Sequence, residues 1–427
     1  MVTQWSDLSS TSCGTKCFSL DYSKVPASPN PSGWQYTNGV ALGAIWKLYE
    51  KTGDVKYYNY VKKFVDKYVS SSGSVPTSTT QDVIQPAVLL PGLYDKTMDA
   101  RYLTAMKSVR TSIDSIKKNT GGAFWHKSNY PDQQWLDGLY MTEPFLAAYA
   151  AKYADSVKSG DSAVAYSIIT NQFKIAHQRL LNTSKKLPYH AWLGSSDGVW
   201  QGLSPSNGKT APLNGQVVSP ILWSRAIGWY FAGLMDVLEY LPANHADRAQ
   251  LVSIAQTLAE GISAQQDATT GLWYQVIDVR NNALPANGGY PSENIAAQPN
   301  WLETSASALF TYGLAKGARL GVLPSSARTV ANKGWAGLKT KVVISGSNVT
   351  VKDAVAGMSV GGTYNAYVNA DFRTDLSSGA LPAPADKCST KPPAFTSHPL
   401  ACKYIYVRDN VPQAVGAVML ASSELEY

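Results

Sequence analysis

The chain has 427 residues, of which 44% are hydrophobic and only 16% are charged, so it can bury a large core. Its net charge of +7 comes without any block of Lys or Arg residues, which favours mild attraction to acidic ligands and argues against nucleic-acid binding. No apolar run is long enough to cross a membrane, so we expect no membrane partner.

Four cysteines stand near the two ends of the chain, at Cys13, Cys17, Cys388 and Cys402. They form no Cys-x-x-Cys pair and the five histidines are scattered, so we expect neither a zinc site nor a cofactor. Of the three possible connectivities we favour the disulfides Cys13–Cys17 and Cys388–Cys402, and four free thiols are the alternative.

Two glycosylation sequons begin at Asn182 and Asn348. Together with the cysteine pattern they predict a secreted, extracellular protein. No signal peptide is recognisable, so we interpret the chain as a mature form with an added Met1.

A sequence repeat marks the first third of the chain. Residues 48–54 (LYEKTGD) recur as residues 93–99 (LYDKTMD), an offset of 45, and the apolar spacing that follows is also repeated. Each copy predicts a helix, a tight turn at Thr-x-Asp and a second helix. A period of this length is typical of a repeated helical hairpin.

Less exact copies follow, and they predict helices over residues 139–153 with 163–181, 225–240 with 246–262, 304–320 with 325–338, and a last helix over 411–424. Strands are expected only over residues 272–279 and 341–351. The first helices of the pairs begin near residues 39, 83, 139, 225, 304 and 411.

Six such helices predict an all-α fold, an (α/α)6 barrel of six helical hairpins with few short strands, closed by the N-terminal segment. An open superhelix is the alternative. No linker with a shift in composition divides the chain, so we expect a single catalytic domain over residues 1–427. The sequence does not indicate an oligomeric state.

Polar residues gather at the start of each expected inner helix: Asn38, Asp82, Asp137, Trp223 with Arg225, Glu303 with Thr304, and Asp409 with Asn410. If the six helices run parallel around a barrel, these side chains meet at one mouth, where the helix N-termini favour an anionic ligand. The alternative is helix capping by Asn, Asp and Thr. Capping explains neither the cation of Arg225 nor the tryptophans at the same level: Trp135, Trp223, Trp229 and Trp301.

Asp137 is the first candidate for catalysis, because it stands between a Trp and a Gly where a loop meets an apolar helix. A carboxyl group against an indole in an apolar mouth is expected to have a raised pKa, as a general acid near neutral pH requires. The alternative for Asp137 alone is a helix N-cap.

These segments resemble the unsaturated rhamnogalacturonyl hydrolases of glycoside hydrolase family 105 over roughly residues 34–425. The matching runs are residues 122–127 (GAFWHK), 135–141 (WLDGLYM), 189–192 (YHAW), 223–229 (WSRAIGW), 271–275 (GLWYQ), 303–307 (ETSAS) and 415–417 (VGA). The run around Asp137 is the most specific of them. The related unsaturated glucuronyl hydrolases share the fold and the chemistry.

The resemblance implies an acidic unsaturated oligosaccharide substrate, whose terminal uronic acid carries a C4=C5 double bond left by a polysaccharide lyase. The enzymes of this family hydrate that enol ether, and the resulting hemiketal opens and releases the neighbouring sugar. Asp137 would be the general acid and base, and Asp82 would assist it. Substrate-binding roles would fall to His190, Arg225, Trp229, Trp223, Trp135, His126 and Tyr36.

Two departures from the family pattern affect the leaving sugar, which the sequence does not identify. Ala226 and Ile227 replace the usual Gly-Asn pair, and Leu193 with Gly194 follows the YHAW run where acidic residues are common. Two other functions remain open. One is an inverting glycosidase that uses Asp82 and Asp137 on saturated sugars. The other is a carbohydrate-binding protein without activity.

Overall fold

The computed structural model describes residues 33–194, 217–219, 221–280, 300–346, 348–355, 357–358, 360, 365–368, 407–408 and 411–427. All four cysteines lie outside these ranges, so the two disulfides stay predictions. The closure of the barrel by the N-terminal segment and the positions of Asp409 and Asn410 lie outside these ranges too, and they also stay predictions. In the described part of the chain, no helix is both long enough and apolar enough to cross a bilayer.

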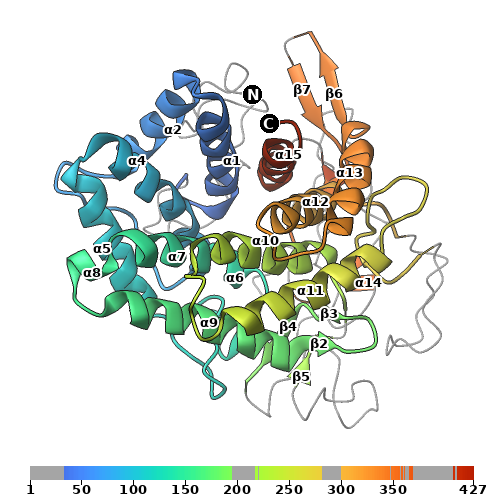
Figure 1. Ribbon diagram of the computed structural model, residues 1–427, viewed down its shortest axis with the longest axis horizontal. Helices are drawn as coiled ribbons and strands as arrows, with labels where there is room; N and C mark the ends of the chain where they lie inside the picture. Colours follow the sequence, from blue (N-terminus) through green and yellow to red (C-terminus); the bar gives the residue numbers. More distant parts are fainter. Residues whose placement is uncertain are drawn as a thin grey trace, which may run out of the picture.

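Six inner helical segments form a closed ring (Figure 1). In chain order they are α1 (Tyr36–Thr52); α3 (Gln81–Ile84) with η3 (Gln85–Leu89) and α4 (Leu90–Thr97); α6 (Gly138–Met141) with α7 (Glu143–Lys152); α10 (Ser224–Tyr240); α12 (Thr304–Arg319); and α15 (Pro412–Leu425). Each segment packs on the next, and α15 returns to pack on α1. This closure confirms the six-membered barrel and rules out the open superhelix.

The outer helices follow their inner partners, as the repeat predicts. They are α2 (Val55–Tyr68), α5 (Ala100–Asp114), α9 (Asp161–Leu180) after the short α8 (Ala154–Val157), α11 (Arg248–Ala264) and α13 (Ser326–Lys339). They bury one face only, whereas α10, α12 and α15 are buried on almost every side. Inner helices contact the barrel interior and the outer layer at once, so they need no polar face.

The two repeated turns have the same hydrogen bonds, which explains why their sequences match. Thr52 and Thr97 each donate to the carbonyl four residues earlier at 2.7 Å. Asp54 and Asp99 each cap the next helix by accepting from the N–H two residues later at 3.0 Å. The Thr-x-Asp signature therefore ends one helix and begins the next.

Short strands brace the loops. β1 (Gln133–Trp135), β4 (Ala191–Leu193) and β5 (Val217–Val218) form an antiparallel sheet, while β2 (Leu181–Asn182) pairs with β3 (Leu187–Pro188) and β8 (Ala354–Val355) with β9 (Val407–Arg408). The strand predicted over residues 341–351 is the hairpin of β6 (Val342–Ser345) and β7 (Asn348–Val351). The strand predicted over residues 272–279 is wrong, since only single bridges form there. That apolar segment is buried as a loop between helices.

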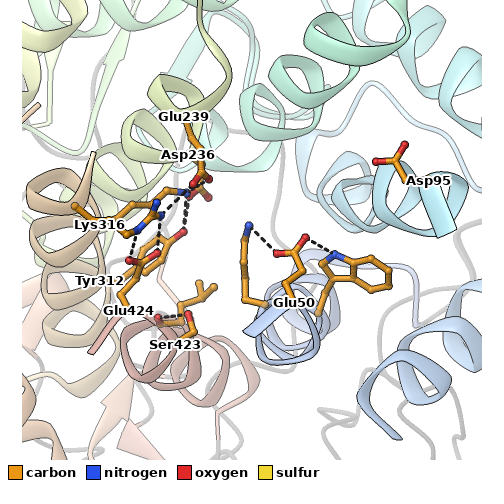
Figure 2. Close-up of polar contacts among 12 residues, drawn as sticks. Glu50, Asp95, Asp236, Glu239, Tyr312, Lys316, Ser423 and Glu424 are labelled. Carbon is orange, nitrogen blue, oxygen red and sulfur yellow. Dashed lines mark hydrogen bonds and ion pairs between the residues drawn. The ribbon is translucent and has the colours of Figure 1, made fainter. Parts of the chain in front are cut away.

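The C-terminal ends of the inner helices carry paired charges (Figure 2). Lys316, only 1% exposed, lies 2.6 Å from Asp236 and 2.7 Å from Glu239. Lys47 pairs with Glu50 at 3.2 Å beside a cavity of about 130 Å³ that these side chains line. We call this side of the molecule the C-terminal end of the barrel.

Candidate active site

Asp137 precedes α6 but does not cap it. Its backbone is already helical, and its side chain makes no capping hydrogen bond. Instead its Oδ2 lies 3.1 Å from Nε2 of His190. Of the six inner-helix starts in the described chain, only that of α12 has a side-chain cap, from Glu303 to the N–H groups of Ser305 and Ala306. Capping therefore does not account for Asp137 or Asp82.

The electrostatic surroundings of Asp137 correct the sequence-based expectation of a raised pKa. Burial raises the pKa of this carboxyl, but the hydrogen bond from His190 and the electrostatic influence of His190, His126 and Arg225 lower it more. The net pKa lies below the ordinary value for Asp. The expectation was wrong because it weighed the neighbouring indole and missed an imidazole that the sheet brings in from 53 residues away.

His190 is fully buried directly before β4, in the YHAW run. The sheet sets its place, because Trp135 of β1 pairs with Ala191 of β4. The N–H of Leu136 also donates to the carbonyl of His190 at 3.1 Å. Backbone pairing thus brings the two predicted residues His190 and Asp137 together.

Tyr367 completes this unit, and the sequence analysis did not predict it. Its hydroxyl lies 2.8 Å from Nδ1 of His190 and 3.3 Å from Oγ of Ser219. Tyr367 belongs to the four-residue helix α14 (Asn365–Val368) and is fully buried. No local pattern marks it, because it lies 177 residues after His190 and outside every motif.

Asp82 lies in the first turn of α3, beside two residues of the GAFWHK run. Lys127 approaches Oδ2 of Asp82 to 2.6 Å, and Nε2 of His126 is 3.8 Å from Oδ1. Burial would lower the pKa of Lys127, yet the charge of Asp82 leaves it raised. Burial lowers the pKa of His126 to about 4, so its imidazole is neutral at neutral pH. Lys127 was missed although it stands next to a predicted residue.

Aromatic rings join these two groups. Trp135 stacks on His126 with ring centroids 4.5 Å apart and on Tyr130 at 4.9 Å. It meets His190 edge-on at 5.4 Å. Trp223 lies on another side of His190, at 4.7 Å. The structure therefore brings Trp135, Trp223, His126 and His190 together, while Trp229, which was expected at the same level, packs on Tyr36 and Tyr140.

Arg225, the second residue of α10, is buried to 2% exposure. It donates to the carbonyl of Val355 and, at 3.5 Å, to Oγ of Ser305, and its guanidinium carbon lies 5.0 Å from the ring centre of Trp223. No carboxylate among the described residues forms an ion pair with it. Arg225 thus keeps a net positive charge that acts on Asp137 and can attract an anion.

Trp229 and Tyr36 form a separate aromatic group. Their rings meet edge-on at 6.5 Å, and Trp229 also packs on Tyr140 at 4.8 Å. Trp229 lies one helical turn after Arg225 and is 1% exposed. The structure therefore places these two predicted residues on one another and leaves their contact with substrate a prediction.

The two departures from the family pattern lie in different surroundings. Ala226 and Ile227 are fully buried in the main core. Leu193 instead packs with Trp135, Ala191 and Val360 in a small cluster next to the site. Of the two changes, the one at Leu193 is thus closer to the catalytic residues.

The chain is similar to known glycoside hydrolases in sequence and in structure. The sequence matches Glycosyl Hydrolase Family 88 over residues 12–380. It is 40% identical over 112 residues to Protein Atu3128 of Agrobacterium fabrum, covering 26% of this chain and 40% of that protein. It is 25% identical over 255 residues to the unsaturated rhamnogalacturonyl hydrolase YesR of Bacillus subtilis, covering 57% and 64%. The chain thus spans less than two thirds of the length of these relatives.

Solved structures show the same barrel. A family 105 glycoside hydrolase from C. acetobutylicum superposes with a TM-score of 0.72 at 27% identity, covering 92% of this chain and 94% of that one. The unsaturated glucuronyl hydrolase of Bacillus sp. GL1 superposes with a TM-score of 0.52 at 16% identity, covering 73% and 76%, a likeness of fold alone. With a family match over most of its length and the (α/α)6 barrel of these structures, the chain belongs to Glycosyl Hydrolase Family 88, a family of glycosidases.

Proposed function

We propose that this protein removes a terminal 4,5-unsaturated uronic acid from lyase-generated oligosaccharides by hydrating the C4=C5 enol ether. The observation that carries the proposal is the Asp137–His190 pair, a fully buried imidazole against a carboxyl that is 14% exposed, beside the positively charged Arg225. Such a pair can give a proton to a substrate and take one back. The family and its named relatives support the same substrate class.

The lowered pKa of Asp137 makes an anionic substrate part of this proposal. In the free protein the carboxyl group is ionised at neutral pH, with His190 as its partner, so it is not yet an acid. A uronate carboxylate bound near Arg225 adds negative charge and offsets the cation that lowers the pKa. The pKa of Asp137 then rises when the substrate is bound. A neutral sugar would not cause this change.

The hydration proceeds in three steps. The Asp137 carboxyl gives its proton to C4, and positive charge develops on C5 and the ring oxygen. Water attacks C5 while the Asp137 carboxylate takes one of its protons, which restores the acid. The C5 hemiketal then opens, and the bond to the neighbouring sugar is released. One carboxyl group therefore serves as acid and base in turn.

Asp82 fits an assisting role better than a catalytic one. Its Oδ2 is bound to Lys127 at 2.6 Å, and its side chain is 11% exposed. An inverting glycosidase needs one carboxylic acid with a raised pKa and one carboxylate that activates water. In the free protein Asp137, with its lowered pKa, is not such an acid. We propose that the Asp82–Lys127 pair holds a ring hydroxyl of the unsaturated uronate.

An absorbance assay tests this function directly. A panel of lyase-generated unsaturated disaccharides, glucuronyl and galacturonyl, sulfated and unsulfated, is incubated with the protein, and loss of the ultraviolet absorbance of the conjugated double bond is followed. We expect loss with at least one disaccharide and no cleavage of the matching saturated ones. Cleavage of saturated glycosides without loss of absorbance would favour the inverting glycosidase. Binding without any reaction would favour a carbohydrate-binding protein.

A further inference from the structure

We infer that Tyr367 is a positioning residue that keeps the proton on Nδ1 of His190, so that only Nε2 exchanges a proton with Asp137. This inference rests on the proposed function, because it assigns a task within the Asp137–His190 pair. Its basis is one chain of contacts: Ser219 Oγ to Tyr367 Oη at 3.3 Å, Tyr367 Oη to His190 Nδ1 at 2.8 Å, and His190 Nε2 to Asp137 Oδ2 at 3.1 Å.

Two proton arrangements of His190 fit this series of contacts. If Tyr367 donates to Nδ1, then a neutral His190 must carry its proton on Nε2 and donate it to Asp137. Asp137 is then held as a carboxylate. If Nδ1 donates to Tyr367, a neutral His190 has a free lone pair on Nε2, which accepts from a protonated Asp137. Only the second arrangement lets Asp137 be an acid beside a neutral imidazole.

Ser219 offers an acceptor that permits the second arrangement. A tyrosine hydroxyl has one proton to donate, and Oγ of Ser219 is an acceptor within reach of it. When Tyr367 donates to Ser219, its oxygen lone pairs remain for Nδ1–H of His190. Ser219 is itself held in place, because its N–H donates to the carbonyl of Ala191 in β4 at 2.8 Å. The sheet that places His190 thus also places the group that orients Tyr367.

The imidazole is held in this orientation by packing. His190 and Tyr367 are both fully buried, and Trp223 lies against the two rings at 4.7 and 6.2 Å. The titratable and charged groups that act on the pair are Asp137 on α6, Tyr367 on α14, and the more distant His126 and Arg225. Among the described residues, none of the others shares a hydrogen bond with Nδ1 of His190, so Tyr367 is the described group that can fix its proton.

Replacing Tyr367 by Phe removes the hydroxyl and leaves the ring. We expect Tyr367→Phe to lower kcat by about 10-fold, because one hydrogen bond to the acid–base group is lost, and to change KM by less than about threefold. The matched control is Tyr230→Phe. That residue is an equally buried tyrosine, whose hydroxyl donates to the carbonyl of Phe173 away from the site, and its turnover should stay within about twofold.

A second measurement does not depend on activity. Nitrogen-15 NMR of histidine-labelled protein, with His190 assigned from its loss in His190→Gln, reports which ring nitrogen is protonated. In the wild type we expect a proton on Nδ1 both when Nε2 donates to the Asp137 carboxylate and when Nε2 has passed its proton on. In Tyr367→Phe we expect a mixture of both tautomers. The control Tyr230→Phe should match the wild type.

The two proposals fail in different ways. If no unsaturated disaccharide reacts but the NMR result is as expected, the substrate class is wrong and the role of Tyr367 stands. If His190 has its proton on Nε2 in the neutral wild type, or if Tyr367→Phe keeps both wild-type turnover and the wild-type tautomer, the positioning role is wrong. A drop in turnover with an unchanged tautomer would overturn it as well, because the loss would then come from packing.

Discussion

The two ends of the barrel contain the same kinds of residues in opposite arrangements. At the C-terminal end, Lys316 reaches two carboxylates at once and Lys47 pairs with Glu50 (Figure 2). At the N-terminal end, Asp137 faces an imidazole, and Arg225 pairs with no carboxylate among the described residues. At the C-terminal end, the carboxylates balanced by permanent cations stabilise the fold. A carboxylate balanced by a group that can lose its charge can take part in proton transfer.

Helix geometry explains why the two arrangements lie where they do. All six inner helices direct their N-termini to one end, so partial positive charge gathers there and favours anions. The opposite end has partial negative charge, and basic residues in the last turns of α1 and α12, Lys51, Lys316 and Arg319, compensate it. Arg225, which no described carboxylate balances, therefore lies at the end of the barrel where the helix N-termini already favour an anionic ligand.

The largest expected difference between the ends concerns Asp137. We expect Asp137→Asn to lower kcat by about 10²-fold or more, the scale of a lost general acid, with the fold intact. The same change at the other end, Asp236→Asn, should leave kcat within about twofold. The measurements are turnover by absorbance and melting temperature. An active Asp137→Asn enzyme would refute the proposed mechanism.

Removing Lys316 should instead lower the stability of the fold and leave substrate binding unchanged. Lys316→Met leaves Asp236 and Glu239 without their buried cation, and we expect a loss of about 3 kcal/mol in the free energy of unfolding with an unchanged KM. The control is Lys152→Met, whose ion pair with Asp95 is 40% exposed and should contribute below about 1 kcal/mol. Urea unfolding of both variants would show whether the C-terminal end serves stability.

Acid should reduce the stability that Lys316 contributes through its ion pair with Glu239. Burial raises the pKa of Glu239, but Lys316, Lys47 and Arg319 together lower it to about 2. A lowered folded-state pKa gives stability that is present above the ordinary pKa of Glu and is lost as the pH falls towards 2. The cost of Lys316→Met should therefore shrink between about pH 4.5 and 2. A constant cost over that range would mean that packing, not charge, is lost.

A substitution of Arg225 tests whether its positive charge, which no described carboxylate balances, binds the carboxylate of the substrate. Arg225→Lys keeps the positive charge and loses the planar fork, so we expect KM to rise by about 10-fold with kcat within about threefold. Steady-state kinetics on the best disaccharide would measure both constants. If neither constant changes, Arg225 does not bind the carboxylate.

The pH dependence of the reaction should show the effect of substrate on Asp137. The pKa of Asp137 is lowered in the free protein, so kcat/KM should fall as the pH rises through that low value. With the anionic substrate bound the pKa is higher, so kcat should be lost at a higher pH than kcat/KM. Coincident alkaline limbs of the two profiles would contradict substrate-induced protonation.

The smallest expected effect concerns the repeated turns. Met98 has φ 52° where the first copy has Gly53 at φ 69°, and Met98 is 69% exposed. Met98→Gly should raise the free energy of unfolding by about 0.5 kcal/mol, because left-handed backbone strain in Met exceeds the entropy cost of Gly. Gly53→Met should lower it by about 1 kcal/mol, since no atom crowds a side chain there and strain alone remains.

The barrel was predictable because its information is local and repeated. Thr-x-Asp turns and apolar spacing marked the paired helices, and the polar helix starts placed Asp82, Asp137 and Arg225 at one end. Tyr367 and the direction of the Asp137 pKa were not predictable, because both depend on contacts made across the fold. The strand expected over residues 272–279 failed for a related reason. Its apolar pattern reflects burial between helices, not strand pairing.

The ion pairs at the C-terminal end also bear on how a polysaccharide could be processed. To thread a sugar chain along the barrel axis, the Lys316 pairs and the Lys47–Glu50 pair would have to separate at an uncompensated cost. These pairs therefore close the C-terminal end of the barrel to a sugar chain. If the protein acts as we propose, the released sugar leaves through the same N-terminal end by which the substrate arrives.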